Sequence, residues 1–77
     1  MEVLLSEITK NSKLKIVQIL STELEAKFAE MGLVSQKEIQ WLFRAPLKDP
    51  IAIEVDDYVL SLRLDEAKHI LVFDLSD

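Results

Sequence analysis

The chain has 77 residues, enough for one domain with a small hydrophobic core. It contains no cysteine, which excludes disulfides and thiolate metal sites. Its formal net charge of −5 disfavours binding to nucleic acid. The hydrophobic fraction of 49% and the charged fraction of 30% are typical of a globular protein. We therefore expect residues 1–77 to form a single domain.

Two further features bear on the cellular compartment. No apolar run approaches the roughly 20 residues that a membrane-spanning helix needs. The N-terminal segment has an acidic residue, Glu2, where a signal peptide has positive charge, and its apolar run is short. These features predict a cytoplasmic protein that does not insert into the membrane.

The first part of the chain predicts a turn of helix followed by a strand. One short helical turn is indicated by the spacing of four apolar residues, Val3, Leu4, Leu5 and Ile8. A polar turn follows over 9–13, with Asn11 as its pivot because asparagine tolerates positive φ. Segment 14–20 is rich in β-branched and other apolar side chains and is predicted to be a strand.

One long helix is predicted next. Thr22 and Glu25 have the spacing of a capping box, which predicts that the helix begins here. The helix carries one apolar stripe, formed by Leu24, Phe28 and Met31. Gly32 is predicted to end the helix in a left-handed conformation, with Leu33 packing back on Phe28.

The second half of the chain predicts four more strands, at 38–45, 51–55, 58–63 and 69–75. Pro46 ends the first of them because it lacks an N–H, and the next cannot begin before Pro50. A tight turn is predicted at Asp56-Asp57 and about one helical turn at 64–68. Five strands and one main helix predict a mostly β (α+β) fold, a small closed or nearly closed five-stranded SH3-like β-barrel.

Three segments of this chain together resemble the ferrous iron transport protein A (FeoA) family. They are Met31-Gly32-Leu33, Ala45-Pro46-Leu47-Lys48-Asp49-Pro50-Ile51, and Ser61-Leu62-Arg63 with Glu66-Ala67 and Ile70. Their order and spacing match the family as well, and the resemblance covers nearly the whole chain. It implies an SH3-like barrel in the bacterial cytoplasm and a protein that is not an enzyme. It also implies a partner, the membrane-embedded ferrous iron permease FeoB, which the family is thought to support or regulate.

The chain departs from the family pattern at several turns. The family commonly has glycine at the positions of Asn11, Lys48 and Asp57, and Pro-Gly at Ser35-Gln36. Asparagine and aspartate tolerate left-handed turns better than glutamine or lysine, so the departures at Gln36 and Lys48 bear on the conformation of their loops. Phe43 is a further departure, because the family often has a charged residue there.

Few residues could carry catalysis or bind a metal. His69, the single histidine, has no carboxylate at a spacing that would orient its ring, and we expect an ordinary strand-edge residue. Asp56-Asp57 and Asp65-Glu66 lack the ligand spacing of calcium loops or histidine–carboxylate sites and are expected to be solvated. A single glycine excludes a glycine-rich phosphate loop. We therefore expect no catalytic residue, no cofactor and no metal site.

A surface for a protein partner is the better-supported expectation. The two prolines order the loop before binding, and an ordered loop loses less entropy when it binds. Within it, Leu47 is either a docking residue or closes one mouth of the barrel. The candidate partner-binding residues are Phe43, Pro46, Leu47, Lys48, Asp49 and Arg63.

Two of these candidates have open alternatives. Alternation with Ile39 and Trp41 favours a core position for Phe43, whereas the family pattern favours an exposed one. Arg63 is expected to form a structural ion pair or backbone brace, or else to contact a partner.

The preferred hypothesis is a cytosolic accessory protein that docks on FeoB and modulates its assembly or its GTPase-coupled transport. One alternative is a direct ferrous-iron-binding sensor or carrier that uses the carboxylates and His69. Another is a freestanding co-regulator of an iron-dependent repressor, whose C-terminal domain is a similar module. The small core and the apolar loops are compatible with a weak homo-oligomer.

Overall fold

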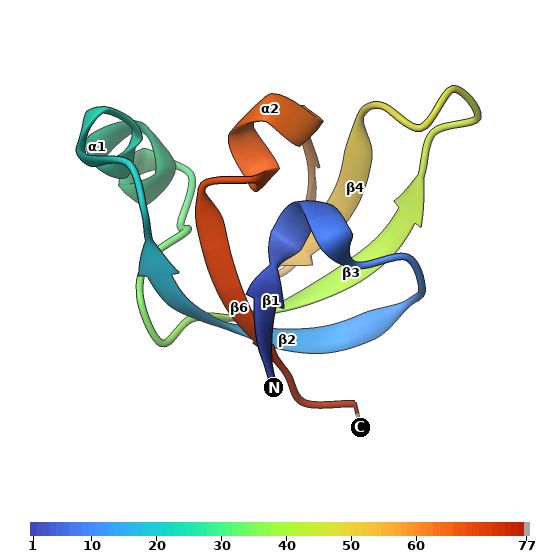
Figure 1. Ribbon diagram of the computed structural model, residues 1–77, viewed down its shortest axis with the longest axis horizontal. Helices are drawn as coiled ribbons and strands as arrows, with labels where there is room; N and C mark the ends of the chain where they lie inside the picture. The colour runs from blue at the N-terminus through green and yellow to red at the C-terminus, as the bar shows by residue number, and fades with distance from the viewer. Residues whose placement is uncertain (77) are drawn as a thin grey trace.

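The computed structural model describes residues 1–76 and consists of six strands, two α-helices and one 3-10 turn. Figure 1 shows them in chain order. The elements are β1 (Glu2–Leu4), the 3-10 turn η1 (Leu5–Glu7), β2 (Ser12–Ile19), α1 (Thr22–Glu30), β3 (Glu38–Arg44), β4 (Ile51–Val55), β5 (Tyr58–Leu62), α2 (Leu64–Ala67) and β6 (Ile70–Asp74).

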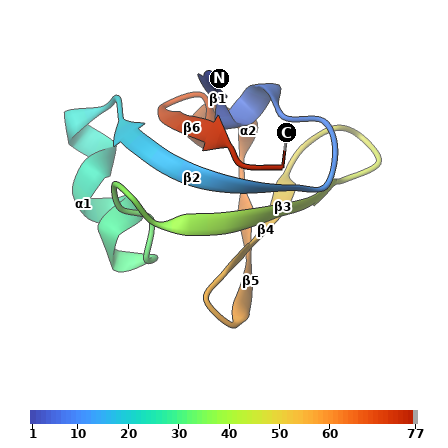
Figure 2. The ribbon, with the colours of Figure 1, turned by 90° about the horizontal axis from the view of Figure 1, so that it is seen from below.

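The strands form one antiparallel sheet in the order β1-β6-β2-β3-β4-β5. Strands β2 to β5 follow one another as a meander, whereas β6 returns to the other side of β2 and β1 pairs with β6. Figures 1 and 2 show that the sheet is strongly bent, with α1 at one end and α2 beside η1. Among residues 1–76, β1 and β5 are the two edges, so the predicted five-stranded barrel is wrong: there is a sixth strand, and the sheet does not close.

The N-terminal segment differs from its prediction. Val3 pairs with Val72, so Glu2–Leu4 is a strand, and only η1 matches the predicted helical turn. The Glu7 carboxylate accepts a hydrogen bond from the Leu4 N–H at 2.9 Å and caps η1. Asn11 is not among the residues with positive φ, and its side chain instead accepts a hydrogen bond from Gln40.

The core lies on the concave face of the sheet and is covered by Phe28 of α1. In β2, β3 and β6 its buried side chains alternate with less buried ones, as a half-buried sheet requires, whereas β4 buries Ile51, Ala52 and Ile53 in succession. The core also includes Leu5, Leu14, Ile16, Leu33, Ile39, Trp41, Ile51, Ile53, Val55, Leu62, Ile70 and Val72. Leu24 and Met31 pack against it, which confirms the predicted helix stripe.

Both ends of α1 have identifiable local causes. The N-cap is Ser21, whose hydroxyl accepts from the Leu24 N–H at 3.3 Å, so the predicted cap at Thr22 is wrong by one residue. At the other end, Gly32 has φ of 85°, and the Leu33 N–H donates to the Phe28 carbonyl at 2.9 Å. This is the predicted C-terminal motif, with buried Leu33 as its apolar contact.

The remaining elements begin and end within two residues of their predictions. Positive φ occurs at Gln36, Lys48 and Asp56, so the left-handed residue of the β4–β5 turn is Asp56 and not Asp57. No helix within residues 1–76 has the length and apolar character needed to cross a membrane.

Candidate functional site

The candidate site is the loop of residues 45–50 that connects β3 and β4, which Figure 1 shows on the far side of the sheet from α1. Two backbone hydrogen bonds close it: the Ala45 N–H donates to the Pro50 carbonyl at 2.9 Å, and the Lys48 N–H donates to the Ala45 carbonyl at 2.7 Å. Lys48 has φ of 74°, the conformation for which glycine is the usual residue. The Asp49–Pro50 peptide bond is cis. The two hydrogen bonds fold the loop back on itself between the ends of β3 and β4.

Asp49 fastens this loop to α2. Its Oδ1 accepts a hydrogen bond from the Leu64 N–H at 3.1 Å, and its Oδ2 lies 3.5 Å from Arg63 Nε. A carboxylate at the first turn of a helix satisfies a backbone donor that has no partner within the helix. Asp49 thus has a structural role, whereas its predicted contact with a partner stays a prediction.

Leu47 projects from the tip of the loop. It is 90% exposed, the largest exposed fraction among the large hydrophobic residues described. The alternative that Leu47 closes one mouth of a barrel is therefore wrong. Pro46 and Lys48 on either side of it are exposed as well. The ordered loop holds this apolar side chain in water, where it contributes nothing to the core. Leu47 is therefore a candidate contact for a partner.

Phe43 lies near the base of the loop and points outward, with 59% of its surface exposed. The register of β3 with β4 shifts between Trp41 and Phe43, because Trp41 pairs with Ile53 and Phe43 with Ala52. Leu42 is the extra residue of this β-bulge, so the alternation that buries Ile39 and Trp41 is reversed beyond it. The core position that alternation favours for Phe43 is wrong.

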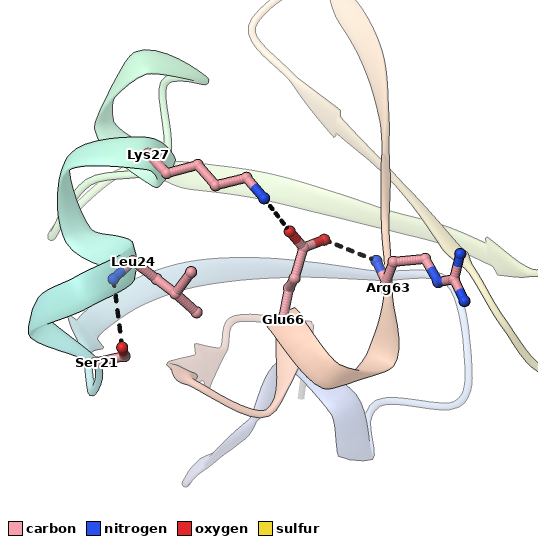
Figure 3. A network of polar contacts seen from close by, with 5 residues as sticks. All are labelled: Ser21, Leu24, Lys27, Arg63 and Glu66. Atoms are coloured by element: carbon pink, nitrogen blue, oxygen red, sulfur yellow. Dashed lines mark hydrogen bonds and ion pairs between the residues drawn. The ribbon is translucent and has the colours of Figure 1, made fainter.

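Arg63 and Glu66 connect the site to the rest of the molecule (Figure 3). The guanidinium of Arg63 pairs with Asp49, and its backbone N–H donates to Glu66 Oε1 at 3.2 Å. The other carboxylate oxygen of Glu66 accepts from Lys27 Nζ at 2.6 Å, which joins α1 to α2. The hydrogen bond from Lys27 lowers the pKa of Glu66, and the Arg63 N–H and the two nearby cations act in the same direction against the effect of burial.

The predicted structural ion pair of Arg63 is therefore present. Asp49, remote in sequence, pairs with its side chain, and Glu66 binds only its backbone. The Arg63 side chain is 73% exposed, so most of it is accessible for a further contact.

The residues considered for a metal site do not come together in the structure. His69 lies just before β6, where its N–H donates to the Glu66 carbonyl at 3.1 Å and its carbonyl accepts from Leu20. Asp56 pairs with Lys37 at 2.6 Å, and Asp65 with Lys68 at 3.9 Å. Within residues 1–76 no three histidine or acidic residues are grouped so that they could hold a metal ion.

Sequence reasoning missed Arg44, which holds the N-terminal segment against β3. Its Nη2 donates to the carbonyls of Ser6 at 3.2 Å and Ile8 at 2.9 Å. Simple alternation with Ile39 and Trp41 would turn Arg44 outward, but the bulge that turns Phe43 outward also changes the direction of Arg44. No local signal in the sequence reveals this contact, because its partners are 36 and 38 residues away.

The bent antiparallel sheet with one main helix places this protein in the class of small SH3-like domains. The FeoA domain family model matches residues 3–73, and the chain belongs to this family. The family comprises small accessory proteins linked to iron uptake and not known as enzymes. The resemblance seen in the sequence is thereby confirmed.

Solved structures agree with this assignment. A FeoA-like protein from Clostridium acetobutylicum is 39% identical, with a TM-score of 0.90 over 99% of this chain and 90% of that one. A crystal structure described as an iron uptake regulatory protein (FeoA) is 32% identical, with a TM-score of 0.85 over 97% of this chain and 99% of that one. No curated protein matches the chain.

A manganese regulator, SloR, has the same fold in part of its chain. Its identity is 16% and its TM-score 0.84, over 94% of this chain and 34% of the regulator. At this identity the likeness shows the fold alone.

Proposed function

We propose that this protein is a cytosolic accessory protein of ferrous iron uptake that docks on the permease FeoB through the loop of residues 45–50. Docking would modulate the assembly of the permease or its GTPase-coupled transport. The observation that carries the proposal is the exposure of Leu47 at the tip of a loop that is held by the hydrogen bonds of Ala45, Lys48 and Asp49. Family membership supplies the link to iron uptake.

The physical argument rests on the entropy of the loop. Ordering a flexible loop on binding costs free energy, and here the hydrogen bonds of Ala45, Lys48 and Asp49 already supply that order. Burying one leucine side chain in a partner's apolar pocket contributes about 1.5–3 kcal/mol. An ordered loop retains most of this contribution as binding affinity.

The charges around the tip indicate the chemistry of the partner surface. Lys48 is exposed beside Leu47, and Arg63 lies at the base of the loop, although the whole chain has a net charge of −5. A partner pocket that is apolar at its centre and acidic at its rim would be complementary to this arrangement. Binding should therefore weaken as salt concentration rises.

The test is a calorimetric titration of the protein against the cytosolic GTPase-containing region of the permease. Leu47→Asp should weaken binding by roughly 10- to 100-fold, because the leucine's burial is lost and a charge is placed in the apolar pocket. The melting temperature should stay nearly unchanged, since Leu47 contributes nothing to the core.

Leu20→Asp is the matched control. Leu20 is also exposed, but it directly precedes the N-cap of α1, at the opposite end of the molecule from the loop. It should leave binding unchanged. The proposal fails if the wild-type protein does not bind at high micromolar concentration and its deletion leaves iron transport unaltered, or if the two variants lose affinity equally.

A further inference from the structure

Strand β5 is an edge of the sheet without the protection that edge strands usually have. Natural edges are made short, bulged or charged so that they do not pair with other chains. The other edge, β1, has three residues and includes Glu2, whereas β5 has five residues, Tyr-Val-Leu-Ser-Leu, with neither charge nor proline. Its register with β4 runs without a bulge, and Figure 2 shows the β4–β5 hairpin projecting from the rest of the sheet.

The register of the hairpin determines which backbone groups face outward. Val55 pairs with Tyr58 across a two-residue turn, and in such a hairpin this pair is hydrogen-bonded and the following pairs alternate. Tyr58, Leu60 and Leu62 therefore use their backbone groups toward β4. Val59 and Ser61 direct theirs away from the sheet, and both residues are exposed, Val59 at 61%.

This edge is complementary to itself. If two copies of β5 lie antiparallel about a twofold axis at Leu60, Val59 of each copy is opposite Ser61 of the other, and the two pairs make about four backbone hydrogen bonds. The same register places Arg63 of each copy opposite Asp57 of the other. Arg63 is 73% exposed and Asp57 is exposed, so an ion pair would close each end of the paired strands.

Other symmetric registers lose this complementarity. An axis at Val59 places Asp57 opposite Ser61, and an axis at Ser61 places Arg63 opposite Val59. With the axis at Leu60, uncharged residues pair at the centre of the contact and residues of opposite charge pair at both ends.

We propose that β5 pairs with β5 of a second copy of this chain, forming a twofold symmetric dimer with a continuous sheet across the Leu60 axis. An isologous interface of this kind closes on itself and leaves no further edge of the same type exposed. The contact surface is one strand wide, which places it in the weak class of interfaces. Leu47 is in a different loop and takes no part in this dimer, whereas Arg63 lies both at the base of the docking loop and at the end of the paired strands.

The register is tested by disulfide formation, which is clean because the chain has no cysteine of its own. Two residues opposite each other in a non-hydrogen-bonded pair have Cα atoms about 4.5 Å apart, within the range that a disulfide spans. Leu60→Cys should therefore cross-link readily under mild oxidation. In the same dimer, Cys residues at position 61 are about 8 Å apart, beyond the limit of about 7 Å, so Ser61→Cys is the matched control and should not cross-link.

The ion pairs are tested by exchanging charges, with sedimentation equilibrium from about 10 μM to about 1 mM as the readout. Asp57→Arg and Arg63→Asp each place like charges opposite one another and should lower the association constant at least about 5-fold. The double variant restores opposite charges and should return to the wild-type value, whereas Leu47→Asp should leave it unchanged.

Four results would overturn the dimer. The first is a wild-type chain that stays monomeric to the highest concentration, and the second is cross-linking of Ser61→Cys as fast as Leu60→Cys. The third is that the single charge variants dimerise like the wild type, and the fourth is that the double variant does not regain the wild-type association constant. A monomer whose Val59 and Ser61 amides become protected from exchange only when the permease region is added would assign the edge to the permease instead.

Discussion

Among residues 1–76, three residues other than glycine adopt positive φ: Gln36 at 77°, Lys48 at 74° and Asp56 at 56°. A side chain with a Cβ is unfavourable in this region by roughly 1–2 kcal/mol, and asparagine and aspartate tolerate it best. Gln36 and Lys48 therefore occupy, at some cost in stability, a conformation that glycine adopts freely.

Gln36→Gly should raise the free energy of unfolding by about 0.5–1 kcal/mol, since relief of the backbone strain exceeds the entropy that glycine adds to the unfolded chain. The Gln36 N–H that donates to the Ile16 carbonyl at 2.7 Å is retained in the variant. Urea denaturation measures the change.

Substitution of the neighbouring residue, Ser35, by glycine should change the free energy of unfolding in the opposite direction. Ser35→Gly removes the hydroxyl that donates to the Val17 carbonyl at 2.8 Å and should lower stability. A lower stability for Gln36→Gly as well would contradict the assignment of strain to position 36.

At the level of single elements, α1 offers two adjacent hydroxyl residues of which the structure uses one. Ser21→Ala should lower the free energy of unfolding by about 1 kcal/mol, because the Leu24 N–H loses its acceptor. Thr22→Ala should change it by less than about 0.5 kcal/mol, since Thr22 is the first helical residue and not the cap. Thermal unfolding of both variants decides between the two caps, and a larger loss for Thr22→Ala would restore the capping box.

The contact between α1 and α2 should be visible as a pH effect. The pKa of Glu66 is lowered from its ordinary value of 4.5, so the ionised carboxylate stabilises the folded state above about pH 4.5, and this contribution is lost as the pH falls through the lowered pKa. Lys27→Met removes the first cause of the shift and should raise the pKa of Glu66, measured by carbon NMR of the carboxyl group.

Lys68→Met provides the comparison, because Lys68 pairs with Asp65 at 3.9 Å and not with Glu66. It should leave the pKa of Glu66 in place. If Lys27→Met also left it unchanged, the bridge between the two helices would not persist in solution.

At the level of the whole molecule, one small core carries nearly all of the stability. A chain of this length has a free energy of unfolding on the order of 4–11 kcal/mol. Phe28 is the largest of the fully buried side chains, so Phe28→Ala should cost about 3–5 kcal/mol, a large part of this stability.

Phe43→Ala deletes the same atoms from the outer face and should change stability by less than about 1 kcal/mol. Circular dichroism with urea denaturation compares the two variants. Equal losses would mean that Phe43 packs inside, against the direction that the β-bulge gives it.

Features that depend on neighbours a few residues apart could be predicted from the sequence. Examples are the end of α1 near Gly32, the end of β3 before Pro46 and the tight turn at Asp56-Asp57. Each of them depends on the φ of one residue or on one missing N–H. The family resemblance rests largely on the same local signals, which is why it could be recognised without a structure.

Features that depend on pairing between distant segments could not be predicted from the sequence and are seen in the folded protein. The shift at Leu42 turns Phe43 outward and Arg44 onto the carbonyls of Ser6 and Ile8, and alternation within β3 contains no sign of it. Whether the sheet closes, and hence whether Leu47 is buried and β5 is free, is set by the register of strands far apart in the chain. A residue's periodicity predicts that it alternates, but only the partner strand decides which face is the inside.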